Sequence, residues 1–327
     1  MACRVLISKG CRHHLSIIIF LFVVIIVQFY NSLFTVTEQG LFVAIESNGG
    51  QIGNQLFHLC SGHGIARKLG RRQYIRTLNS EGFYIGEHLK KIETIFPRLV
   101  NAYSVLKVWN EHRVPFAQRN GHISCCEYED PVRLMNRTEQ FLVLDFHYAQ
   151  NVRYFEYMIS EIRQLLEFSP SVAEEGKEVL QRLAMSNGEA MCAHIRRTDF
   201  VDLNVASDFH SSVDDIVSIA SQQNLSKFLI FGDDADFMRR MTDNIDSRLN
   251  TIGKTRALFS RHWEGIDFYL ASQACGAILI TAPTSTFGWW LAFFVQNQNA
   301  VFYSRDLRRM GDKIPQKDMF LATWKAF

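Results

Sequence analysis

Side chains that suit phosphate and nucleotide binding lie close together in the stretch His194-Ile195-Arg196-Arg197-Thr198-Asp199. The apolar run over residues 190–193 predicts a buried strand before them, and open α/β sheets bind ligands at the carboxyl ends of their strands. Guanidinium groups are planar, permanently charged donors that fit phosphate oxygens. We therefore interpret Arg196 and Arg197 as phosphate ligands, Asp199 as a carboxylate that holds one guanidinium, and His194 as a ligand for a base or a sugar. A surface salt-bridge cluster is the alternative.

Three further motifs accompany this cluster. A glycine-rich stretch with Gly-Asn-Gln occupies residues 50–57, a Gln-x-x-x-Tyr-Phe segment residues 150–155, and Ser-Thr-Phe-Gly-Trp-Trp residues 285–290. In content and order the four motifs resemble those of the fucosyltransferases that use GDP-fucose, above all the α-1,2-fucosyltransferases. The resemblance extends from about residue 43 to residue 303.

The resemblance implies an inverting transfer of L-fucose from GDP-β-L-fucose to the 2-hydroxyl of a terminal β-galactoside on a glycan. It implies no cofactor and no metal, because the arginines would screen the diphosphate charge, one binding it while Asp199 holds the other. The donor-binding residues that it implies are His194, Arg196, Arg197, Asp267, Ser285, Thr286, Gly53, Asn54 and Gln55. Each has a purely structural alternative, such as a tight strand–helix turn at the glycines, N-capping by Ser285, or Asp267 as an acid at a helix N-terminus.

Asp234 and Asp236 form an Asp-x-Asp pair, a pattern that holds a metal in many glycosyltransferases. They follow an apolar run over residues 227–231 and precede a helical pattern, so we favour a strand-to-helix turn with a capping aspartate. Family members often have glycine where this chain has His147, a departure that leaves the acceptor specificity open. A fucosyltransferase of another linkage or acceptor, or an inactive membrane-anchored protein that binds a GDP-sugar or glycan, are the alternatives.

The N-terminus predicts membrane anchoring. Residues 15–34 are mostly apolar and just long enough to cross a bilayer, and Arg4, Lys9 and Arg12 precede them. By the positive-inside rule, residues 1–14 stay in the cytosol and residues 35–327 enter the lumen. We favour an uncleaved Golgi signal anchor, single-pass type II, over a cleaved signal peptide. Asn136 and Asn224 lie in N-glycosylation sequons.

Composition limits the remaining possibilities. The hydrophobic content is 47%, which supports a large core, and the net charge of +2 does not favour nucleic-acid binding. Among the seven cysteines, Cys192 and Cys275 lie in apolar contexts, which favours buried thiols over bridge partners.

Periodicity predicts an α/β protein with a mostly parallel sheet. The expected strands cover residues 41–45, 73–75, 141–144, 190–195, 227–231, 277–281 and 301–303, and the expected helices cover 54–69, 154–168, 213–220, 235–241, 265–275 and 287–295. The resemblance implies two Rossmann-like halves around a cleft, the GT-B-type arrangement, preceded by one transmembrane helix. Residues 41–168 would form the first half and residues 169–327 the donor-binding half.

Overall fold

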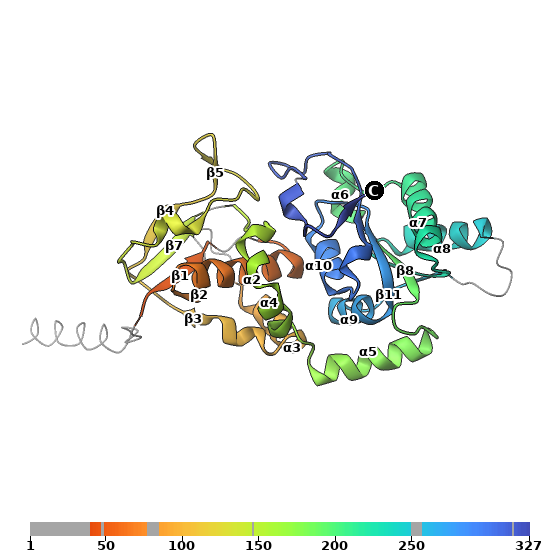
Figure 1. The fold of residues 1–327 in the computed structure, drawn as a ribbon, viewed down its shortest axis with the longest axis horizontal. Helices are drawn as coiled ribbons and strands as arrows, with labels where there is room; N and C mark the ends of the chain where they lie inside the picture. Colours follow the sequence, from red (N-terminus) through yellow and green to blue (C-terminus); the bar gives the residue numbers. More distant parts are fainter. Residues whose placement is uncertain (1–39, 47–48, 77–84, 146, 250–256, 316) are drawn as a thin grey trace, which may run out of the picture. The chain divides into compact units, whose positions relative to one another are not determined.

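Two parallel β-sheets, one from each half of the sequence, organise the chain (Figure 1). A computed structural model describes residues 40–327 apart from 47–48, 77–84, 146, 250–256 and 316. The expected membrane anchor over residues 15–34 lies outside these described residues. Within them, no helix is long and apolar enough to cross a membrane.

The first sheet has five strands in the order β3-β2-β1-β7-β4, and every neighbouring pair is parallel. Its strands are β1 (Phe42–Ile45), β2 (Arg72–Arg76), β3 (Ser104–Leu106), β4 (His112–Pro115) and β7 (Phe141–Asp145). The helices of this half are α2 (Ile52–Lys68), α3 (Gly86–Ile95) and α4 (Ile159–Leu165). A short antiparallel pair, β5 (Gln118–Arg119) and β6 (His122–Ile123), stands apart from the sheet.

The second sheet has six strands in the order β10-β9-β8-β11-β12-β13, again all parallel. Its strands are β8 (Ala190–Ile195), β9 (Lys227–Gly232), β10 (Ala257–Phe259), β11 (Cys275–Ile280), β12 (Val301–Tyr303) and β13 (Lys325–Ala326). Its helices are α5 (Pro170–Arg182), α6 (Thr198–Asp202), α7 (Phe209–Gln223), α8 (Ala235–Arg248), α9 (Glu264–Ala274) and α10 (Thr286–Phe294). The α/β prediction is thus confirmed. All residues of β8 are buried, as helices on both faces of a parallel sheet require.

The predicted helix over residues 154–168 is wrong in extent. Only Ile159–Leu165 is α-helical, and two 3₁₀ turns, Val152–Tyr154 and Glu156–Met158, precede it. The Asn151 side chain accepts a hydrogen bond from the backbone N–H of Arg153 at 3.1 Å, a local contact that competes with helix formation. Pro170 does not simply end this helix but begins α5, where its fixed φ suits the first helical position.

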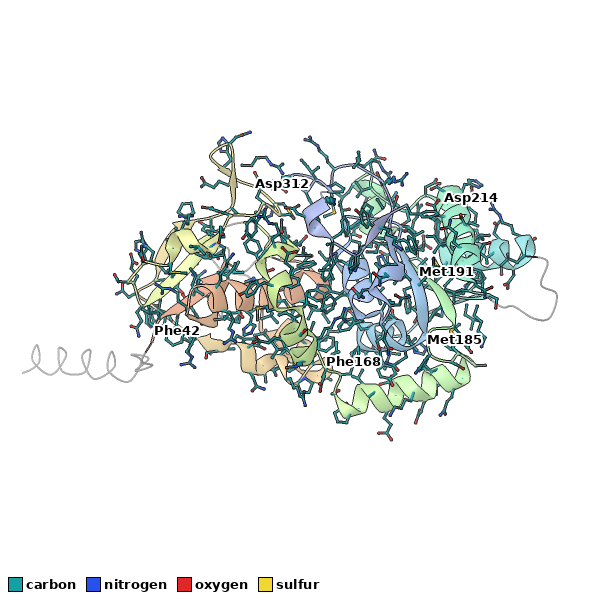
Figure 2. All side chains as sticks on the ribbon, in the orientation of Figure 1. Phe42, Phe168, Met185, Met191, Asp214 and Asp312 are labelled. Carbon is teal, nitrogen blue, oxygen red and sulfur yellow. A yellow bond between two sulfur atoms is a disulfide. The ribbon has the colours of Figure 1, made fainter. Side chains whose placement is uncertain are left out.

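One hydrophobic cluster joins the two halves, because α2 of the first packs against α10 of the second. The Phe57 ring of α2 lies 4.7 Å from Trp289 and 5.1 Å from Trp290 between ring centroids. Each sheet also has a cluster of its own, marked in Figure 2 by Phe42 on β1 and by Met191 on β8. The two tryptophans are therefore core residues that hold the halves together.

The prediction that Cys192 and Cys275 are buried thiols is wrong, since they form a disulfide. Cys192 lies on β8 and Cys275 on the neighbouring strand β11, with their Cα atoms 5.6 Å apart, a separation that a disulfide can span. Adjacent strands thus bring together residues 83 positions apart in the sequence. A second disulfide joins the neighbours Cys125 and Cys126.

Candidate active site

A pocket of about 320 Å³ lies where the two halves meet. The turn before α2, the end of β8 and the turn before α10 each contribute to its wall. Its polar and small lining residues include Gly50, Gly53, Asn54, Arg196, Asp199, Thr284, Ser285 and Thr286. The structure thus brings together residues from three of the four motifs.

Arg196 is the charged donor of this pocket. It directly follows β8, and its guanidinium forms ion pairs with Asp199 at 2.7 Å and with Asp233 at 3.1 Å. The side chain keeps 23% of its surface exposed. Two carboxylates therefore fix the guanidinium, yet part of it remains accessible to an anion in the pocket.

Arg197 does not line the pocket. It donates from Nη1 to the Ser207 carbonyl at 2.9 Å, and its guanidinium lies 4.4 Å from the Phe237 ring centroid. We expected one arginine to bind the diphosphate and Asp199 to hold the other, but in the structure the same arginine lies at the pocket and also pairs with Asp199. Asp199 pairs with Arg196, the arginine that lines the pocket.

Two helix N-termini converge beside Arg196. A Cβ atom on Gly53, in the first turn of α2, would lie 2.8 Å from the backbone nitrogen of Phe287 in α10, so glycine permits the close approach. Trp290 Nε1 donates to the Gly53 carbonyl at 2.9 Å, and Ser285 caps α10 by accepting from the Gly288 N–H at 3.4 Å. Free backbone N–H groups and two helix dipoles make such a junction a binding site for anions.

His194, Asp267 and Gln55 are buried and are not among the residues that line this pocket. Burial, and next the charge of Arg196, lowers the pKa of His194 to about 3, so its imidazole is neutral at physiological pH. Burial raises the pKa of Asp267 to about 7, although Ser260 donates to its carboxylate at 2.5 Å. Gln55 donates to the Gly50 carbonyl at 3.3 Å, which supports the turn before α2.

The Asp-x-Asp pair serves the start of α8. Asp234 Oδ1 accepts from the Phe237 N–H at 2.9 Å, as the capping interpretation expects, and exposed Asp236 pairs with Arg239 at 2.6 Å. Over the described ranges of the chain, no three His, Cys, Asp or Glu side chains gather where they could hold a metal ion.

Two residues of this region were missed in the sequence. Asp233 accepts from the Arg197 backbone N–H at 2.8 Å and from Thr198 Oγ1 at 2.5 Å, in addition to its pair with Arg196. Its position at the end of β9, next to β8, could have revealed it, because neighbouring parallel strands end at the same edge. Lys313 is buried and lies in an irregular segment, where no sequence pattern marks it.

Comparisons with known proteins now assign the family. Residues 95–326 match the family model described as Glycosyl transferase family 11. The chain belongs to this family. Two relatives named galactoside 2-alpha-L-fucosyltransferase, both from Caenorhabditis elegans, are each 30% identical; one aligns over 85% of this chain and 73% of the relative, the other over 84% and 76%. The crystal structure of POFUT1 in complex with GDP has a TM-score of 0.48 at 13% identity, over 79% of this chain and 95% of that chain.

Membership of Glycosyl transferase family 11 confirms the resemblance that the four motifs predicted, and with it an enzyme of the glycosyltransferase class. The matched region contains the whole second sheet and the pocket residues that it supplies, Arg196 and Ser285 among them. The Gly-Asn-Gln stretch lies before the matched region but lines the same pocket.

Proposed function

We propose that this enzyme transfers L-fucose from GDP-L-fucose to the 2-hydroxyl of a terminal β-galactoside on a glycan. The observation that carries the proposal is the position of Arg196 beside the paired N-termini of α2 and α10. This junction combines a guanidinium with the free N–H groups of two helix ends, which are donors that fit the oxygens of a nucleoside diphosphate. The names of the relatives supply the sugar and the linkage.

The proposed reaction is a single displacement that inverts the anomeric carbon. The acceptor hydroxyl oxygen bonds to C1 of fucose and its proton passes to solvent water, while the bond from C1 to the diphosphate oxygen breaks and its electron pair leaves with GDP. Arg196 and the N–H groups at the two helix ends stabilise the charge that develops on the leaving phosphate. Because these donors are fixed before the reaction, transfer would need no metal. The two halves would then enclose the donor in the GT-B-type manner.

The guanine would be recognised by residues of the second half. The Asp267 carboxylate, when ionised, can accept two hydrogen bonds from the N1–H and the amino group of guanine. His194, a neutral imidazole, can contribute one donor or one acceptor from the same side of the sheet. Asp267, Ser285, Thr286, Gly53, Asn54 and Gln55 remain the proposed donor-site residues, the last supporting the turn before α2.

The proposed location is the Golgi membrane, with residues 15–34 as a type II anchor and the catalytic region in the lumen. Both sequon asparagines, Asn136 and Asn224, are exposed and could accept a glycan. Full-length protein from a eukaryotic host should therefore shift in mass after endoglycosidase treatment. Absence of any shift, with a C-terminus open to protease from the cytosol, would reverse the orientation.

The decisive experiment is an assay of the chain with GDP-fucose and a panel of β-galactosides, with and without EDTA. We expect fucose on the 2-hydroxyl, shown by NMR of the product, and activity that survives chelation. Transfer to another hydroxyl or acceptor would correct the linkage, whereas GDP-fucose binding without any transfer would indicate an inactive binding protein. Loss with EDTA and recovery with Mn²⁺ would overturn the arginine-based mechanism.

A further inference from the structure

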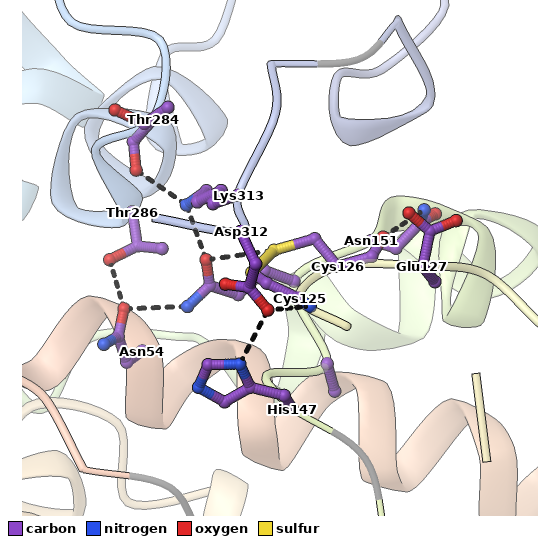
Figure 3. The surroundings of a disulfide bond; sticks show 12 residues. Asn54, Cys125, Cys126, Glu127, His147, Asn151, Thr284, Thr286, Asp312 and Lys313 are labelled. Carbon is purple, nitrogen blue, oxygen red and sulfur yellow. Dashed lines mark hydrogen bonds and ion pairs between the residues drawn. A yellow bond between two sulfur atoms is a disulfide. The ribbon is translucent and has the colours of Figure 1, made fainter. Parts of the chain in front are cut away.

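Lys313 is a buried lysine that contacts Thr284, one of the residues that line the proposed donor pocket. Only 3% of it is exposed, and its Nζ donates to Gln150 Oε1 at 2.5 Å and to the Thr284 carbonyl at 2.6 Å (Figure 3). Both acceptors are neutral. The carboxylate nearest in sequence is Asp312, but its Oδ2 interacts with His147 and with the Cys125 N–H and not with Lys313. Burial lowers the pKa of Lys313 to about 7. A buried lysine without a carboxylate partner destabilises the fold.

Its effect is to set the direction of a chain of hydrogen bonds that crosses between the halves. In its protonated form the Lys313 amine has only donors, and its Nζ faces the carbonyl oxygen of Gln150. The amide nitrogen of Gln150 then faces Asn54 and donates to Asn54 Oδ1 at 3.0 Å. Side-chain amides have two near-equivalent orientations, and here the lysine selects one for both residues.

Asn54 is thereby left with donors only. Its Oδ1 also accepts from Thr286 Oγ1 at 2.7 Å, which uses the second lone pair. Its Nδ2 makes a long contact of 3.4 Å with the Gly49 carbonyl, and a Cβ atom on Gly50 would lie 1.9 Å from that nitrogen. Asn54 and Gly50 both line the pocket. The remaining N–H of this amide is thus available at the pocket, where it suits phosphate or sugar oxygens.

We propose that Lys313 is a positioning residue of the donor site, which acts through Gln150 to keep the N–H donors of Asn54 turned toward the bound sugar diphosphate. This inference rests on the proposed function. Without the ammonium, Gln150 can turn over and offer its oxygen to Asn54. The Asn54 amide would then turn as well and direct its oxygen at the anionic donor, which is repulsive.

A double-mutant cycle tests the proposal, because residues that act through one another have non-additive effects. Lys313→Met keeps the length of the side chain and removes its donors. We expect about tenfold weaker GDP-fucose binding by calorimetry, and a melting temperature no lower than that of the wild type, since a buried cation is removed. Asn54→Ala should cost a similar factor, and Lys313→Met in that background should add less than about twofold.

Two further variants keep the test sharp. Gln150→Glu supplies the buried lysine with a counter-charge, but the new carboxylate cannot donate to Asn54. It should therefore weaken GDP-fucose binding as Lys313→Met does, and it tests the same role if Lys313→Met folds poorly. Lys317→Met removes an exposed lysine of the same segment and should change nothing. Wild-type affinity in Lys313→Met, or multiplicative losses in the cycle, would overturn the positioning role. Failure of the wild type itself to bind GDP-fucose would instead refute the proposed function.

Discussion

The two sheets carry opposite charge at equivalent positions. The residue that follows β1, near the middle of the first sheet, is Glu46, whereas the residue that follows β8 in the second sheet is Arg196. Glu46 is buried and paired with Arg76 at 2.7 Å and with Arg113. Arg196 is paired with two aspartates but stays partly exposed in the pocket. A carboxylate between arginines and an arginine between carboxylates thus occupy corresponding strand ends.

We expect the Glu46 cluster to contribute to stability and the Arg196 cluster to contribute to binding. The Glu46 cluster does not line the pocket, so its ion pairs serve the first half internally. The Arg196 cluster lies beside two helix N-termini, where an added anion meets positive potential. The general lesson is that a charged strand end becomes an anion site only where its geometry leaves the charge accessible.

The two disulfides should differ most in their effect on stability. Cys192 and Cys275 close a loop of 83 residues, so replacing both by alanine should lower the free energy of unfolding by about 4 kcal/mol. Cys125 and Cys126 are neighbours and close no loop, so their double alanine variant should lose less than about 1 kcal/mol. Urea unfolding of both variants measures the difference. Equal losses would contradict the entropic argument.

Glu46→Gln should lower the free energy of unfolding by about 3 kcal/mol, because two arginines lose a shared, buried carboxylate. The KM for GDP-fucose should change less than about twofold, as Glu46 lies outside the pocket. Glu178→Gln is the matched control: its pair with Arg182 is exposed, at 3.8 Å, and should contribute under about 0.5 kcal/mol. A stable Glu46→Gln variant without activity would instead place Glu46 in catalysis.

Sequence reasoning succeeded where local pattern and local chemistry coincide. Strand β8 is apolar along its whole length and ends in charged residues, so the strand and the arginine cluster were both predictable. It failed where the outcome depends on distant partners. The Cys192–Cys275 pair requires the order of strands in the sheet, and Lys313 acquires its partners only when an irregular segment crosses to the other half.

Arg196→Lys should reduce kcat/KM for GDP-fucose by about a hundredfold, equivalent to about 2.7 kcal/mol. Lysine keeps the positive charge but lacks the planar guanidinium, which pairs with Asp199 and Asp233 at the same time and still faces the pocket. Arg197→Lys is the internal control, expected to lose less than about tenfold, because Arg197 contacts the Ser207 carbonyl and Phe237 instead. Near-normal activity and GDP binding in both variants would show that the diphosphate binds elsewhere.

The smallest predicted effect is a pH dependence of donor binding that originates at Asp267. Burial raises the pKa of this carboxyl to about 7, so the acid is mostly neutral at pH 6 and mostly ionised at pH 8. Only the ionised form can accept both guanine hydrogen bonds, so affinity for GDP-fucose should rise with pH, by about tenfold over this range.

GDP-fucose is the right probe because its diphosphate is esterified at both ends, whereas the terminal phosphate of free GDP itself titrates near pH 6. Asp267→Asn cannot ionise, and the ratio of its dissociation constant to that of the wild type cancels other titrations, Lys313 included. That ratio should grow about tenfold from pH 6 to pH 8, and a constant ratio would show that Asp267 supports α9 without reading the base.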